Sequence, residues 1–160
     1  MNNEKDNVYD LVEDFYAHDE GWNTLLRQEY AEGFLRMEAW KGKKNSDLYR
    51  SWDNLTMLCL YLGSAETFLG DMNADDFIDC IAWCGRNISE FTPDYKNTQD
   101  FLETCDGLFK YLKGKNAISN DTVPATAAEI LLQEGKMNII LPDGSFDEAN
   151  AERAWNATPD

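Results

Sequence analysis

The chain has 160 residues, of which 43% are hydrophobic and 12% aromatic, and it carries a formal net charge of −16 at pH 7. This hydrophobic and aromatic content excludes a disordered chain, and the length fits one domain that needs no metal or disulfide to fold. The negative charge disfavours nucleic acid and anionic membranes as partners, because both repel carboxylates.

The first two predicted helices and a lysine-rich loop occupy residues 1–45. Apolar residues recur at helical spacing over residues 8–16 and predict a short helix, which Gly21 ends. The same spacing predicts a longer second helix over residues 22–41. The loop that follows contains three lysines beside a helix C-terminus, where positive charge is favourable: Lys41, Lys43 and Lys44.

Four more helices are predicted in the region 46–135, which we interpret as the helical core. Asn45 or Ser46 can cap the first of them, which runs to Gly63. The others cover residues 74–85, with Asn73 as N-cap, residues 101–114, and a short stretch that begins at 121 and ends at Gly135. Lys110, Lys113 and Lys115 form a second lysine cluster at the end of the helix 101–114.

The C-terminal region 136–160 changes character. Residues 137–141 are rich in branched side chains and predict a short strand, and a turn signal follows at 142–144. Ser145 and Glu148 have the spacing of a capping box, which predicts a last short helix. The sequence therefore predicts a mostly α, compact bundle of five to seven helices in one domain, with a short β element near residues 137–146.

No residue pattern predicts a metal or cofactor. Residues 71–75 resemble the start of a calcium loop, but the sixth position is Asp76 instead of glycine and the twelfth is Ala82 instead of glutamate. A four-thiolate site can be drawn from the four cysteines, but their spacing favours packing in the core: Cys59, Cys80, Cys84 and Cys105. We therefore predict no cofactor, no metal and reduced thiols, as in a cytoplasmic protein.

Catalytic patterns are also missing from the sequence. The single histidine, His18, has no nucleophile or oriented triad near it in the chain. The polar N-terminus is not a signal peptide, and no apolar run is long enough to span a bilayer. Pairs of carboxylates occur, but a chain with 30 acidic residues contains such pairs by chance.

Residues 46–120 resemble the N-terminal core-binding, SAM-like domain of tyrosine recombinases. The similarity lies in helix order and in four segments: residues 52–62, 72–77, 98–112 and 116–118. The resemblance implies a core of four or five helices. The catalytic domain of that family, with its arginines, histidines and tyrosine nucleophile, is absent. Where the family binds DNA with basic helices this chain is acidic, so the resemblance implies an accessory protein without a recombinase role.

The function that we predict is docking by a non-enzymatic, cytoplasmic, bacterial or phage-type interaction protein. Its acidic surface would direct it to a basic protein partner, and four apolar residues would form the contact: Trp83, Met137, Ile139 and Leu141. Strand pairing through residues 137–141 would also give a homodimer.

Two alternatives stay open. One is a nucleic-acid-binding accessory protein that uses the two lysine clusters, whose sign would be a salt-sensitive DNA affinity. The other is a metal-dependent enzyme built on clustered carboxylates.

Overall fold

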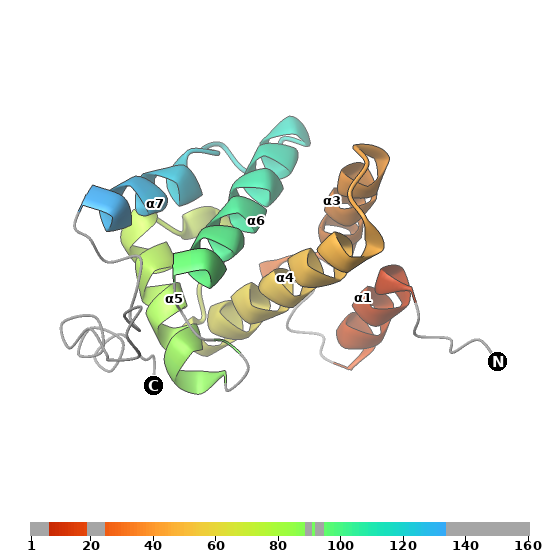
Figure 1. Cartoon of the computed structure of the whole chain (residues 1–160), viewed down its shortest axis with the longest axis horizontal. Coiled ribbons are helices and arrows are strands. Elements are labelled where there is room, and N and C mark those ends of the chain that lie inside the picture. The colour runs from red at the N-terminus through yellow and green to blue at the C-terminus, as the bar shows by residue number, and fades with distance from the viewer. Residues whose placement is uncertain (1–6, 19–24, 89–90, 92–94, 134–160) are drawn as a thin grey trace. The chain divides into compact units, whose positions relative to one another are not determined.

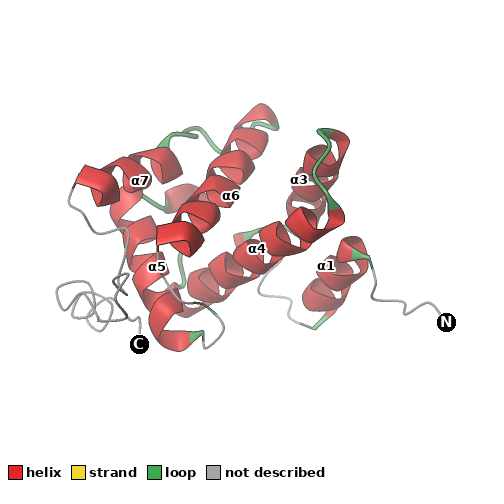
Figure 2. Ribbon diagram, in the orientation of Figure 1, coloured by secondary structure: helices red, strands yellow, loops and turns green. Residues whose placement is uncertain are grey.

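A computed structural model of the chain describes residues 7–18, 25–88, 91 and 95–133. This part is all-α, with six α-helices, one 3-10 turn and no strand (Figures 1 and 2). The predicted helical class is thus confirmed. The predicted strand and the last helix fall in residues 134–160, outside the described residues. No helix within the described ranges has the length and hydrophobicity to cross a membrane.

Contacts within the chain group it into two compact units, residues 1–69 and 70–160. The first unit contains α1 (Val8–Ala17), α3 (Gln28–Trp40) and α4 (Asn45–Ala65), and each of these helices contacts the other two. Its core includes large side chains with less than 2% of their surface exposed: Val12, Phe34, Leu35, Leu55, Leu58 and Leu62.

Helix α1 follows directly from its sequence. The side chain of Asn7 accepts a hydrogen bond from the backbone N–H of Tyr9 at 2.8 Å and caps the helix. Three buried residues, Val8, Val12 and Tyr16, recur every four positions and form one face of the helix. These features confirm the helix predicted over residues 8–16.

Helix α3 begins later than predicted. The sequence predicts one continuous helix from residue 22, but Arg27 has extended backbone angles and α3 starts at Gln28. The carbonyl of Leu26 accepts a hydrogen bond from the buried Tyr16 hydroxyl. This tertiary contact fixes the chain in a bend just before α3, and helical spacing alone does not reveal such a contact.

Helix α4 differs from prediction at both ends. Its N-cap is Lys44, without a side-chain cap hydrogen bond, so neither Asn45 nor Ser46 caps it. The helix continues through Gly63 to Ala65 and ends where Glu66 turns left-handed, with φ of 53°. The N–H groups of Glu66 and Thr67 then both bond to the Leu62 carbonyl, which satisfies groups at the helix end.

The second unit contains α5 (Ala74–Asn87), α6 (Tyr95–Gly114) and α7 (Val123–Gln133), and α7 contacts both other helices. The rings of Phe77 on α5 and Phe109 on α6 meet edge to face, with centroids 5.3 Å apart. Leu108, Leu112 and Phe101 on α6 are also fully buried. The 3-10 turn η1 (Leu69–Asp71) precedes α5 in the chain.

Candidate functional site

The six lysines of the two predicted basic clusters belong to different units and differ in their ion-pair partners. Lys41, Lys43 and Lys44 lie in the first unit, whereas Lys110, Lys113 and Lys115 lie in the second. All six are exposed.

Two lysines of the second cluster form ion pairs with neighbouring aspartates, and the third lies over an aromatic ring. Lys110 Nζ lies 2.7 Å from Asp106 Oδ2, and this hydrogen bond raises the pKa of the Lys110 ammonium. Lys113 Nζ lies 3.7 Å from Asp121 Oδ1, and Lys115 Nζ lies 5.7 Å from the ring centroid of Tyr111. An external anion would therefore compete with the aspartate partners of Lys110 and Lys113.

The first lysine cluster is different. Lys41, Lys43 and Lys44 have no ion-pair partner among the described residues. They connect α3 to α4, and they follow Trp40, whose side chain is 89% exposed. Figure 2 shows this connection as a loop between the two helices. We call residues 40–44 the basic turn.

Trp83 was predicted as the exposed aromatic contact, and the structure places it half-buried on α5. Asp76 and Asp79 precede it by seven and four positions, so the three side chains lie along one face of the helix. All three are partly exposed. We call Asp76, Asp79 and Trp83 the α5 face.

Sequence reasoning missed Trp40, which is the most exposed aromatic residue in the described part of the chain. The buried residues of α3 are Ala31, Phe34 and Leu35. Trp40 follows Ala31 by nine residues, which is about two and a half helical turns, so it points away from the buried face. Including Ala31 and Leu35 in the predicted apolar stripe would have placed Trp40 on the solvent side.

Three of the predicted contact residues cannot be placed, because Met137, Ile139 and Leu141 lie outside the described residues. The strand and the dimer contact that were predicted from them stay predictions.

None of the four cysteines forms a disulfide, and all four are buried. Cys59 lies in the first unit, with its sulfur 3.9 Å from the Tyr16 hydroxyl, whereas the other three belong to the second unit. Burial raises the pKa of Cys59 to about 12 and that of Cys80 well above its ordinary value. These two thiols are therefore protonated and unreactive at neutral pH.

The predicted calcium-like segment is a helix start. The Asn73 side chain accepts from the Asp76 N–H at 2.9 Å, and the Asp76 carboxylate accepts from the Asn73 N–H at 2.9 Å. This capping box confirms Asn73 as the N-cap of α5. Across the described ranges, no group of three or more His, Cys, Asp or Glu side chains is arranged to hold a metal ion.

His18 sits at the C-terminal end of α1 and is exposed. Its Nδ1 lies 2.7 Å from the carbonyl oxygen of Asp14. This contact holds the ring against its own helix, so the position of His18 is explained by local structure alone.

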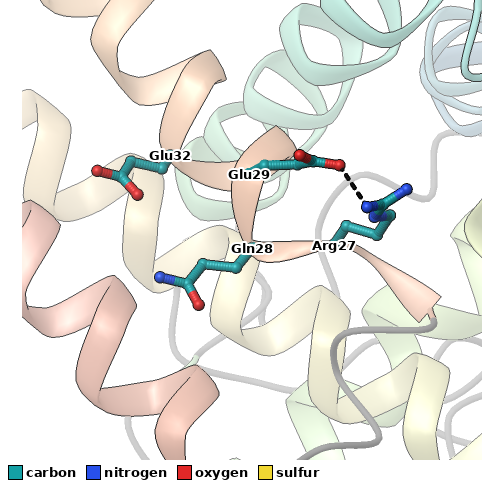
Figure 3. Close-up of a pocket in the computed structure, with 4 residues that line it drawn as sticks. All are labelled: Arg27, Gln28, Glu29 and Glu32. Carbon is teal, nitrogen blue, oxygen red and sulfur yellow. Dashed lines mark ion pairs between the residues drawn. The ribbon is translucent and has the colours of Figure 1, made fainter.

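A pocket of about 460 Å³ lies at the N-terminal end of α3, lined by Arg27, Gln28, Glu29 and Glu32 (Figure 3). Its charged groups are already engaged. Arg27 pairs with Glu29 at 2.8 Å, and Glu32 pairs with Arg36 at 2.8 Å. In Figure 3 the Glu32 carboxylate points away from the Arg27–Glu29 pair, so the two carboxylates do not converge on one point. The pocket therefore lacks a shared site for a cation.

Comparisons with known proteins give no relative for this chain: no family model, no curated protein and no solved structure matches it. The resemblance to the recombinase core-binding domain stays a prediction. The structure divides residues 46–120 between the two units, with α4 in the first and α5 and α6 in the second.

Proposed function

We propose that the chain is a non-enzymatic interaction protein that docks on a basic protein partner. The observation that carries this proposal is the α5 face, on which Asp76, Asp79 and Trp83 align along one helix. An indole ring beside carboxylates fits a partner that presents a basic side chain next to an apolar one. Tryptophan is among the residues that contribute most to such contacts.

The surface charge also supports docking on a basic partner. Asp10, Glu13, Asp71 and Asp75 are exposed and have no ion-pair partner in the described part of the chain. Together with the formal net charge of −16, such carboxylates would attract a basic partner over a distance and accelerate its association. We also propose the cytoplasm as the compartment, supported by four buried cysteines that form no disulfide.

The first test is a pull-down from host lysate at low and high salt, with mass spectrometry of the bound proteins. We expect one basic protein that is lost at high salt, because exposed ion pairs are screened. The purified partner is then titrated with the chain by calorimetry. A partner that stays bound at high salt, or an acidic one, would contradict docking through carboxylates.

Matched variants locate the contact. Asp79→Asn removes one charge from the α5 face, and Trp83→Phe shortens the aromatic contact. Both should weaken binding to the purified partner, the tryptophan change by about tenfold or more. Glu103→Gln is the control, because Glu103 is an exposed residue of α6 in the same unit. Equal binding by Asp79→Asn and the wild type would place the contact elsewhere.

The metal-dependent enzyme is tested separately by a thermal shift with millimolar magnesium, manganese or calcium. A ligand that binds only the folded state raises the melting temperature. We expect no shift with any of the three ions. A clear shift with one of them would overturn the non-enzymatic assignment and favour a carboxylate site.

A further inference from the structure

The basic turn carries charge opposite to that of the molecule as a whole. Lys41 follows α3, Lys43 lies in the loop, and Lys44 is the N-cap of α4. Gly42 reverses the chain between them with a φ of +98°, a conformation that favours glycine. The turn thus presents three exposed ammonium groups within four residues, on a chain with a formal net charge of −16.

The ammonium groups of the basic turn are available to a ligand. None of the three has an ion-pair partner among the residues that the structure describes, whereas Lys110 and Lys113 are paired with Asp106 and Asp121. An external anion would therefore displace no internal salt bridge at the basic turn.

Trp40 provides a flat aromatic surface next to these lysines in the chain. Its side chain is 89% exposed, so the indole ring is open to solvent. The pocket described on α3 lies at the opposite end of that helix, about 18 Å away along its axis. A partner that needs only a ring face, such as a nucleobase, fits better here than a side chain that needs a cavity.

The charge of the whole chain limits the shape of the ligand. A flat bilayer or a duplex would bring many phosphates close to a chain with a formal net charge of −16, which repels them. A single strand is narrow and flexible, so it can contact the turn while the rest of its backbone stays in solvent. Stacking on an aromatic ring and lysine contacts to phosphates are the two interactions by which proteins hold single strands.

We propose that the basic turn binds a short segment of single-stranded nucleic acid, with one base stacked on Trp40 and phosphates bound by Lys41, Lys43 and Lys44. This site is independent of the α5 face and of the proposed protein partner. If both are used, the chain connects a basic protein to a single strand.

The test is a fluorescence-anisotropy titration of a labelled oligothymidylate of about twelve nucleotides with the full-length chain. We expect binding at low salt. The logarithm of the association constant should fall with the logarithm of salt concentration at a slope of about −2, because each of three phosphate contacts contributes about −0.7. A duplex of equal length should bind more weakly.

Variants separate stacking from charge. Trp40→Ala should weaken binding by about fivefold or more without changing the salt slope, because stacking involves no ion release. The triple variant Lys41→Gln, Lys43→Gln and Lys44→Gln should flatten the slope. The matched control changes the three lysines of the second cluster to glutamine, at positions 110, 113 and 115. It should bind as the wild type does, because Lys110 and Lys113 are already paired with Asp106 and Asp121. Trp40 is too exposed for its loss to unfold the chain.

Four outcomes would overturn the proposal. One is no anisotropy change at millimolar protein and low salt. Another is equal loss in the control triple variant. A third is displacement of the oligonucleotide by a polyglutamate peptide as efficiently as by unlabelled strand, which would show that bases contribute nothing. The last is binding to phosphatidylserine vesicles in preference to the strand, which would indicate a lipid surface.

Discussion

The Tyr16 hydroxyl connects α1 to the segment just before α3. The residue is 3% exposed, and its hydroxyl donates a hydrogen bond to the Leu26 carbonyl just before α3. Tyr16→Phe removes the donor and leaves that buried carbonyl without this partner. We expect a loss of about 1–3 kcal/mol in the free energy of unfolding, measured by urea denaturation.

Tyr30→Phe is the control for this change. Tyr30 is half-buried, and no hydrogen bond of its hydroxyl occurs within the described residues. Its removal should change the free energy of unfolding by less than about 0.5 kcal/mol. Equal effects of the two substitutions would refute the structural role of the Tyr16 hydroxyl.

Because Cys59 is buried, we expect the free energy of unfolding to depend on pH in the alkaline range. Burial raises its pKa from 9.0 to about 12, and burial also raises the pKa of Tyr16. The unfolded thiol loses its proton above about pH 9, whereas the folded thiol keeps it. The contribution of Cys59 to the free energy of unfolding is therefore fully present below pH 9 and falls as the pH rises to 12. Cys59→Ala should reduce this decline by up to about 1.4 kcal/mol per pH unit.

The measurement is urea denaturation at several pH values from neutral to about 11, with a reducing agent present. The variant and the wild type should differ by a constant amount below pH 9 and converge above it. Parallel curves over the whole range would show that Cys59 ionises equally in the folded and unfolded states.

The cysteines and Trp40 show how far a sequence predicts whether a side chain is buried or exposed. All four cysteines were correctly predicted as core residues, because each sits on an apolar stripe. Trp40 was harder, because its exposure depends on which face of α3 is buried. That face is set by contacts of α3 with α1 and α4. The stripe through Ala31 and Leu35 is present in the sequence, but only these contacts show that it is the buried one.

At the level of elements, the capping box of α5 gives a measurable prediction. Asn73→Ala removes the side-chain acceptor of the Asp76 N–H and should cost about 1 kcal/mol of stability. Asn45→Ala is the control, because Asn45 lies at the start of α4 but does not cap it. A cost at position 45 as large as at position 73 would contradict this assignment of caps.

The helices themselves were predicted well and their ends less so. The start of α5 was predicted because capping is a local interaction between Asn73 and Asp76. The start of α3 depends on Tyr16, and α4 passes the glycine that was expected to end it. Interactions within one turn of a helix can be predicted from the sequence, whereas interactions with another helix cannot.

For the whole molecule, charge predicts a response to salt. With a formal net charge of −16, the folded chain repels itself, and salt screens this repulsion. The melting temperature should rise as sodium chloride increases from about 0.01 to 0.1 M, which shortens the screening length from about 30 to 10 Å. Each kcal/mol of relieved repulsion corresponds to about 2–4 °C for a chain of this size.

A charge-reduced variant serves as the control. Glu13→Gln, Glu103→Gln and Glu129→Gln remove three exposed charges. Their combination should be more stable at low salt and less sensitive to added salt. A melting temperature that falls with salt in the wild type would instead indicate that attractive ion pairs outweigh repulsion.

The fluorescence of the exposed Trp40 reports the local electrostatic potential. Iodide, an anionic collisional quencher, is depleted around an acidic protein, whereas caesium is enriched there. Trp40 is 89% exposed beside three lysines, so its emission samples a small zone of opposite potential. The emission that Trp40→Phe removes should thus be quenched by iodide more readily than by caesium, and iodide quenching should weaken as salt is added.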